Sequence, residues 1–110
     1  MSLQSARAHI FEFEALIRAG RYFEAHEAME EVWIARGRRR GDLWQALTQL
    51  AVAITHASRG NHRGAERVLR KAESKLSAGL AEYDLPEDAL QFALESYESE
   101  FTRTGRSESE

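Results

Sequence analysis

The stretch GRYFEAHEAMEEVW, residues 20–33, has the spacing of an amphipathic helix that carries polar residues on its apolar side. At 100° per residue, His26 and Glu30 fall in the half of the helix that also holds most of the apolar side chains, whereas Glu27 falls in the opposite half. Because His26 and Glu30 are four residues apart, they are neighbours on the side expected to be buried. The stretch therefore predicts a helix with a polar site, although it names no reaction.

Apolar residues recur at helical spacing on both sides of this stretch, and the sequence predicts about five helices. Their expected ranges are 2–19, 22–35, 42–59, 62–78 and 86–101. Gly20 is placed to end the first helix, and Pro86 suits the first turn of the last. The helix at 42–59 is apolar over most of its circumference, so we expect it to be central. The predicted fold class is all-α, a compact bundle or irregular array of helices, with tetratricopeptide-like helical-hairpin packing as one arrangement.

Composition sets the expected class of protein. Of the 110 residues, 43% are hydrophobic, which is enough for the core of one helical domain. The sequence has no cysteine, which excludes disulfides and thiolate chemistry. We expect a single domain over residues 1–101 and a flexible polar tail over 102–110. No apolar run of membrane-spanning length and no secretion signal is apparent, so we expect a cytoplasmic protein without a membrane partner.

Charge is distributed unevenly along the chain. The net charge is −3, yet residues 36–75 contain ten Arg or Lys against three Asp or Glu. This asymmetry favours either an acidic partner for the middle of the chain or association of two copies through opposite charges. Arginines at 38–40 and at 63, 67 and 70 offer weak nucleic-acid binding as an alternative. A pI of about 5.8 is not that of a dedicated nucleic-acid binder, so we do not expect nucleic acid as the main partner.

The central helix has one polar seam. Gln45, Gln49 and His56 fall within a narrow sector of an otherwise apolar helix, and buried polar groups need hydrogen-bond partners. We expect this seam to face the preceding helix, so that His26, Glu30, Gln49 and His56 form one polar cluster.

Three functions fit such a cluster. The first is structural, a hydrogen-bonded network within a helical protein or interaction module that binds a protein, a peptide or a second copy of itself. The second is a divalent-metal site for zinc, nickel, manganese or iron, held by His26, Glu30 and His56, which would support a hydrolase-like enzyme. The third is metal-free acid-base catalysis with His26 as the base. The sequence does not decide whether the protein is an enzyme.

Two sequence blocks carry a family resemblance. The pattern His26-Glu27-x-x-Glu30-x-x-Trp33, followed by a block with Gln49 and His56, resembles the family catalogued as domain of unknown function 309. The resemblance covers roughly residues 10–80. It implies a small all-helical protein with no established activity, in which these six residues are the motif positions.

Overall fold

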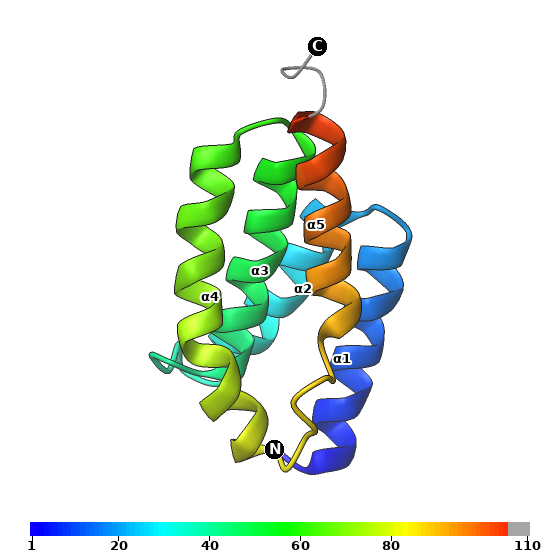
Figure 1. Cartoon of the computed structure of the whole chain (residues 1–110). Coiled ribbons are helices and arrows are strands. Elements are labelled where there is room, and N and C mark those ends of the chain that lie inside the picture. The colour runs from blue at the N-terminus through cyan, green and yellow to red at the C-terminus, as the bar shows by residue number, and fades with distance from the viewer. Residues whose placement is uncertain (106–110) are drawn as a thin grey trace.

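The computed structural model describes residues 1–105 and contains five helices. They are α1 (Leu3–Arg18), α2 (Tyr22–Ala35), α3 (Leu43–Ser58), α4 (His62–Glu82) and α5 (Gln91–Gly105). Successive helices run antiparallel to one another (Figure 1), and residues 1–105 contain no strand. The predicted all-α class is confirmed. None of the helices described is long and apolar enough to cross a membrane.

Helix α3 lies at the centre, as its apolar circumference predicts. It packs against α2, α4 and α5, while α1 closes the far side by packing against α2 and α5 (Figure 1). Trp44, Leu47 and Leu50 have no solvent-exposed surface. Burying an aliphatic or aromatic side chain of this size contributes roughly 1.5–3 kcal/mol. The hydrophobic burial along α3 therefore holds the other helices in place around it.

Side chains and glycines define the helix ends. Asp42 begins α3, where its Oδ1 accepts a hydrogen bond from the backbone N–H of Trp44 at 3.1 Å, and Asn61 does the same for α4 through Gly64 at 3.1 Å. Gly20 follows α1 with φ +75°, a conformation that side chains with a Cβ rarely adopt. The prediction that Gly20 ends the first helix is therefore confirmed.

The fifth helix begins later than the sequence predicts. Residues 86–90 form hydrogen-bonded turns, including Ala89 N–H to the Pro86 carbonyl at 3.1 Å, and α5 starts only at Gln91. The placement of Pro86 in the first helical turn is therefore wrong. Leu90 is almost fully buried, and the turns bring it into the core before the helix starts. Helix α4 also continues four residues beyond the expected end at residue 78.

The last helix extends past residue 101, where the sequence predicts a polar tail. Residues 102–105 belong to α5, and the Thr104 hydroxyl donates to the Ala57 carbonyl at 2.8 Å. Arg103 reaches the carbonyl of Ser58 at 3.0 Å. These polar contacts join the end of α5 to the end of α3. Hydrophobic periodicity does not predict them, because it reports only apolar burial. The rest of the predicted tail, 106–110, lies outside the described residues.

Candidate functional site

Helix α2 presents its motif residues at the edge of the core rather than inside it. His26 Nε2 lies 3.9 Å from Glu30 Oε2, and their side chains are 24% and 44% exposed. The two residues are neighbours, as their spacing predicts. Their full burial is not confirmed, because α2 contacts α3 along only one side and leaves this pair at the boundary with solvent.

The polar seam of α3 is divided among several partners. Gln45 accepts from the Gly41 N–H at 2.9 Å, and Gln49 accepts from Lys75 of α4 at 3.0 Å. Burial, followed by the nearby charge of Lys71, lowers the pKa of Lys75. Gln49 therefore interacts with α4 rather than with His26 and Glu30, so the expected cluster of four residues is not formed as one network.

His56 has a defined hydrogen-bonding state. The Oδ1 of Asn61 accepts from the Gly64 N–H, so the NH₂ group of Asn61 faces His56 Nδ1 at 3.1 Å and donates to it. The neutral His56 ring consequently carries its proton on Nε2. The same asparagine thus starts α4 and fixes the tautomer of His56.

His26 and His56 meet at one pocket between α2 and α3, which we call the α2–α3 groove. It has a volume of about 180 Å³. Its lining residues are Phe23, His26, Val52, Thr55, His56 and Arg59. Phe23 is 64% exposed on the rim, and its ring centroid lies 5.9 Å from that of His26. The groove therefore combines an aromatic face, an apolar wall and two imidazoles.

A second hollow of about 410 Å³ continues the α2–α3 groove. It shares Phe23, Thr55 and Arg59 with the first and extends to Arg21 and Glu24 near the start of α2. Glu24 is paired with Arg21 at 3.2 Å. Within residues 1–105, the guanidinium of Arg59 has no hydrogen-bond or ion-pair partner. The unpaired charge of the groove is therefore positive.

The expected metal ligands do not form a ligand set. Among residues 1–105 there is no group of three or more His, Asp or Glu side chains that could hold a metal ion. His26 and Glu30 are adjacent, but His56 instead interacts with Asn61. The geometry therefore gives the metal-dependent hydrolase no three-residue site at His26, Glu30 and His56.

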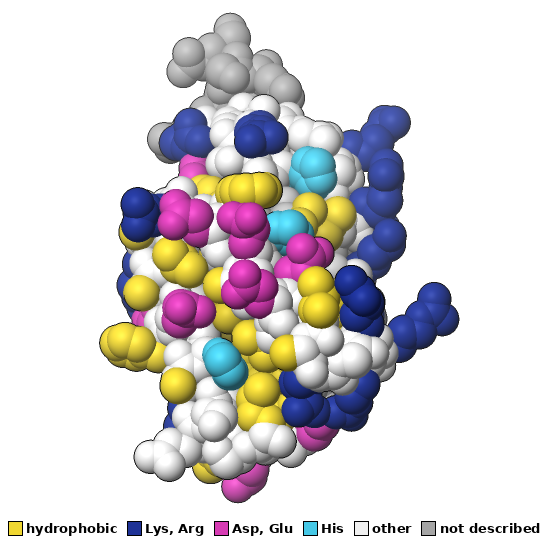
Figure 2. All heavy atoms as spheres, turned by 180° about the vertical axis from the view of Figure 1, so that it is seen from behind, with side chains coloured by type: hydrophobic (Ala, Val, Ile, Leu, Met, Phe, Trp, Pro, Cys, Tyr) yellow, Lys and Arg dark blue, Asp and Glu magenta, His cyan; other side chains and the backbone are white. Residues whose placement is uncertain are grey.

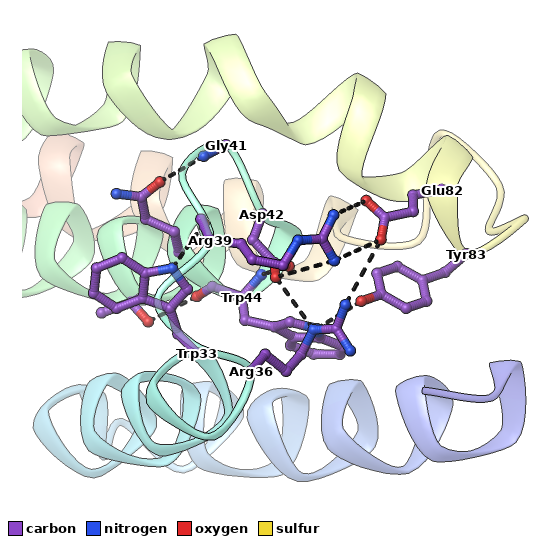
Figure 3. A network of polar contacts seen from close by, with 10 residues as sticks. Trp33, Arg36, Arg39, Gly41, Asp42, Trp44, Glu82 and Tyr83 are labelled. Carbon is purple, nitrogen blue, oxygen red and sulfur yellow. Dashed lines mark hydrogen bonds and ion pairs between the residues drawn. The ribbon is translucent and has the colours of Figure 1, made fainter.

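The other two motif residues have different surroundings. Glu27 is exposed on the outer face of α2, as its position in the helix predicts. Trp33 donates from its indole Nε1 to the carbonyl of Arg39 at 2.9 Å (Figure 3). The motif tryptophan therefore braces the loop between α2 and α3 and does not contribute to the α2–α3 groove.

At the other end of α2, two arginines belong to a network that we call the arginine–aspartate network (Figure 3). Asp42 is only 2% exposed and lies 3.2 Å from Arg36 Nε and 3.9 Å from Arg39. Arg36 and Arg39 also reach Glu82 at the end of α4, at 3.8 and 3.3 Å. The hydrogen bond to Glu82 raises the pKa of Arg39. Part of the arginine-rich loop is thus paired within the molecule.

Aromatic residues extend this network into the core. The Trp44 indole donates to the Tyr83 hydroxyl at 3.0 Å, and the Arg36 guanidinium lies 5.8 Å from the centre of the Tyr83 ring. Sequence reasoning missed Asp42, Glu82 and Tyr83. Only Asp42 had a local signal, because Asp directly before an apolar helical run is a typical helix cap.

The last contact that the sequence did not predict joins α4 to α5. His62 stacks on Phe101 with ring centroids 4.1 Å apart and hydrogen-bonds to Thr104 at 2.8 Å. Near it, Tyr22 donates to Glu100 at 2.6 Å. Burial, together with this hydrogen bond, raises the pKa of Tyr22 to about 12. Of these residues, Tyr22 also lines the hollow that continues the α2–α3 groove.

The fold and site define a small all-helical protein. Some of its motif residues line the α2–α3 groove, and Trp33 stabilises the loop between α2 and α3. The family model described as Domain of unknown function (DUF309) matches residues 10–68, more than half of the chain, and the protein belongs to this family. The chain is also similar to the uncharacterized protein YpuF of Bacillus subtilis (strain 168), with 40% identity over 58 residues. That similarity covers 52% of this chain and 33% of YpuF. No solved structure matches.

The range matched by the family model includes the α2–α3 groove but only part of the arginine–aspartate network. All residues of the α2–α3 groove lie inside residues 10–68, whereas Glu82 and Tyr83 of the arginine–aspartate network lie beyond it. The family match and the relative carry no activity. Function is therefore inferred from the groove itself.

Proposed function

We propose that the protein is an interaction module that binds a segment of a partner protein in the α2–α3 groove. The observation that carries the proposal is the combination of an exposed aromatic side chain, Phe23, with a guanidinium, that of Arg59, which is unpaired within residues 1–105; both line one pocket. Exposed aromatic residues and arginine are the side chains that most often dominate protein interfaces.

The α2–α3 groove is a small pocket that continues into a wider hollow, and this shape favours a peptide over a cofactor. The inner pocket of about 180 Å³ is smaller than the roughly 300 Å³ at which small-molecule sites begin. It is large enough for one apolar side chain. The neighbouring hollow, lined by exposed residues at the start of α2, has room for the main chain on one side of that residue.

The charge of the groove favours a carboxylate next to that apolar side chain. Arg59 is unpaired within residues 1–105, and the Nε2–H of His56 is a donor in a side chain that lines the pocket. A carboxylate is the natural partner of a guanidinium, because two N–H groups can donate to its two oxygens. The proposed ligand is therefore a protein segment with an apolar residue beside Asp or Glu, met in the cytoplasm.

The test is a selection of random displayed peptides on the folded protein, with binding then measured by calorimetry. We expect enriched peptides to carry an apolar residue next to an acidic one, and Phe23→Glu and Arg59→Glu to weaken their binding at least about tenfold, as for loss of an interface anchor. Phe11→Glu is the matched control, because Phe11 is 74% exposed on α1, outside the groove. No enrichment, or equal binding by all variants, would contradict the proposal.

A further inference from the structure

Two charged stripes on different helices have matching spacing. Glu24, Glu27 and Glu31 lie on the exposed side of α2, at intervals of three and four residues. Their side chains fall within a sector of about 60° on the helix. Acidic side chains gather over the middle of the molecule seen from behind, where α2 lies (Figure 2). We call this surface the acidic stripe.

The basic stripe lies on α4. Arg63, Arg67 and Arg70 are exposed, at intervals of four and three residues, and also fall within about 60° of one another. Basic side chains line the edge of the molecule that α4 forms (Figure 2). The outer residues of each stripe are seven positions apart, which is about 10 Å along a helix axis. The two stripes therefore have equal length and opposite charge.

The order of the intervals sets an orientation. When α4 of one molecule lies antiparallel to α2 of another, the three-residue and four-residue steps coincide. Glu24 then faces Arg70, Glu27 faces Arg67 and Glu31 faces Arg63. A parallel alignment puts a step of three against a step of four. The same antiparallel register places the exposed Phe23 opposite Lys71, whose hydrocarbon chain and ammonium group both suit an aromatic surface.

Most of these charges have no partner among residues 1–105 of their own molecule. Glu27, Glu31, Arg63 and Arg67 form no ion pair within residues 1–105, whereas Arg70 lies 3.9 Å from Glu66 and Glu24 lies 3.2 Å from Arg21. The acidic and basic stripes lie on different helices that make no substantial contact with each other. They are free to meet the opposite stripe of a second copy.

We propose that the protein associates with itself through the acidic stripe of one copy and the basic stripe of the next. The contact joins two different surfaces, so it leaves one free stripe of each kind and permits rings or longer chains. This inference shares Phe23 and Glu24 with the α2–α3 groove and the hollow that continues it, but it does not depend on a ligand there. Its test measures assembly rather than peptide binding, so either proposal can fail alone.

The test is sedimentation of the full chain over a range of protein concentrations, at about 10 mM and about 1 M ionic strength, where the Debye lengths are about 30 and about 3 Å. We expect assemblies at low salt that dissociate at high salt. Glu27→Arg/Glu31→Arg and Arg63→Glu/Arg67→Glu should each raise the dissociation constant about tenfold or more, because attraction at two charge pairs becomes repulsion.

Mixing supplies the decisive control. Neither double variant should assemble alone, but an equal mixture should, because the unchanged acidic stripe of one variant meets the unchanged basic stripe of the other. The control Glu12→Arg/Glu98→Arg changes the net charge by the same amount as Glu27→Arg/Glu31→Arg, at exposed positions outside both stripes. It should assemble like the parent. A monomeric parent at low salt, or a mixture that stays monomeric, would overturn the proposal. So would binding of duplex RNA by the basic stripe without self-association.

Discussion

The two ends of the α2–α3 pair use arginine in opposite ways. Near the end of α2, Arg36 is 19% exposed and lies between the buried Asp42 and the exposed Glu82. Near the end of α3, Arg59 is exposed and is unpaired within residues 1–105, beside a pocket and an exposed phenylalanine. Both arginines belong to the basic middle of the sequence, yet Arg36 stabilises the fold and Arg59 is available to a ligand. Pairing, rather than charge, distinguishes their roles.

The largest expected effect is at the paired end. Asp42→Ala removes both the cap of α3 and the partner of Arg36, so we expect the free energy of unfolding to fall by about 3 kcal/mol. Asp42→Asn keeps a side-chain oxygen for the cap and should lose about half as much. Urea unfolding measures both changes. A loss from Asp42→Ala no larger than that from the exposed Asp88→Ala would show that the network adds nothing to stability.

The next effect concerns how closely the helices pack at the same end. A Cβ on Gly79 would lie 3.0 Å from the Cα and Cβ of Leu43, which is fully buried. Gly79→Ala should therefore lower the free energy of unfolding by about 1.5 kcal/mol, since overpacking outweighs the gain in helix propensity. Thermal unfolding checks this, with the exposed Ser77→Ala as the control. Stabilisation by Gly79→Ala would mean that α3 and α4 shift apart easily.

A smaller effect is expected at Tyr22, which lines the hollow beside the α2–α3 groove. Tyr22→Phe removes the hydrogen bond to Glu100 and should cost about 1 kcal/mol near neutral pH. Tyr22 has a pKa raised from 10.0 to about 12, so its contribution is complete below pH 10 and is lost as the pH rises through about 12.

The parent should therefore lose stability more steeply than Tyr22→Phe across this alkaline range. Urea unfolding at neutral pH and near pH 11 measures the difference. Tyr97, whose pKa is also raised by burial, titrates in both proteins and cancels in the comparison. Parallel pH profiles would indicate that the Tyr22 hydroxyl is not bonded in solution.

The smallest effect on stability is expected at the rim of the groove. Phe23→Ser removes a side chain that is mostly exposed, so the free energy of unfolding should change by no more than about 0.5 kcal/mol. Calorimetric unfolding checks this, and the exposed Phe11→Ser serves as the comparison. A loss above about 2 kcal/mol would identify Phe23 as a core residue and remove it as a ligand anchor.

Local sequence signals predicted much of this fold and less of its polar contacts. The limits of α2 and the central place of α3 followed from hydrophobic periodicity, because that period reports which side of a helix is buried. The hydrogen-bond partner of Gln49 could not be predicted from hydrophobic periodicity. Its sector of α3 lies between α2 and α4, and periodicity does not say that Lys75 would reach it first.

The α2–α3 groove and the arginine–aspartate network also differ in how far their contacts could be predicted from local sequence. His26 and Glu30 were predictable as neighbours because they are one helical turn apart. Arg39 and Glu82 are 43 residues apart and meet only because α4 runs four residues further than expected. The helix cap at Asp42 had a local signal, but no local signal indicated that its carboxylate would be buried.

The most direct test of the account compares Arg36→Ala with Arg59→Ala in two assays, urea unfolding and calorimetric binding of the selected peptides. Arg36→Ala should lose about 2 kcal/mol of unfolding free energy, because it leaves a buried carboxylate short of a partner, and should bind peptide normally where it is folded. Arg59→Ala should unfold within about 0.5 kcal/mol of the parent and bind peptide at least about tenfold more weakly. If Arg59→Ala binds like the parent, or destabilises the fold as much as Arg36→Ala, the division between a structural end and a binding end is wrong.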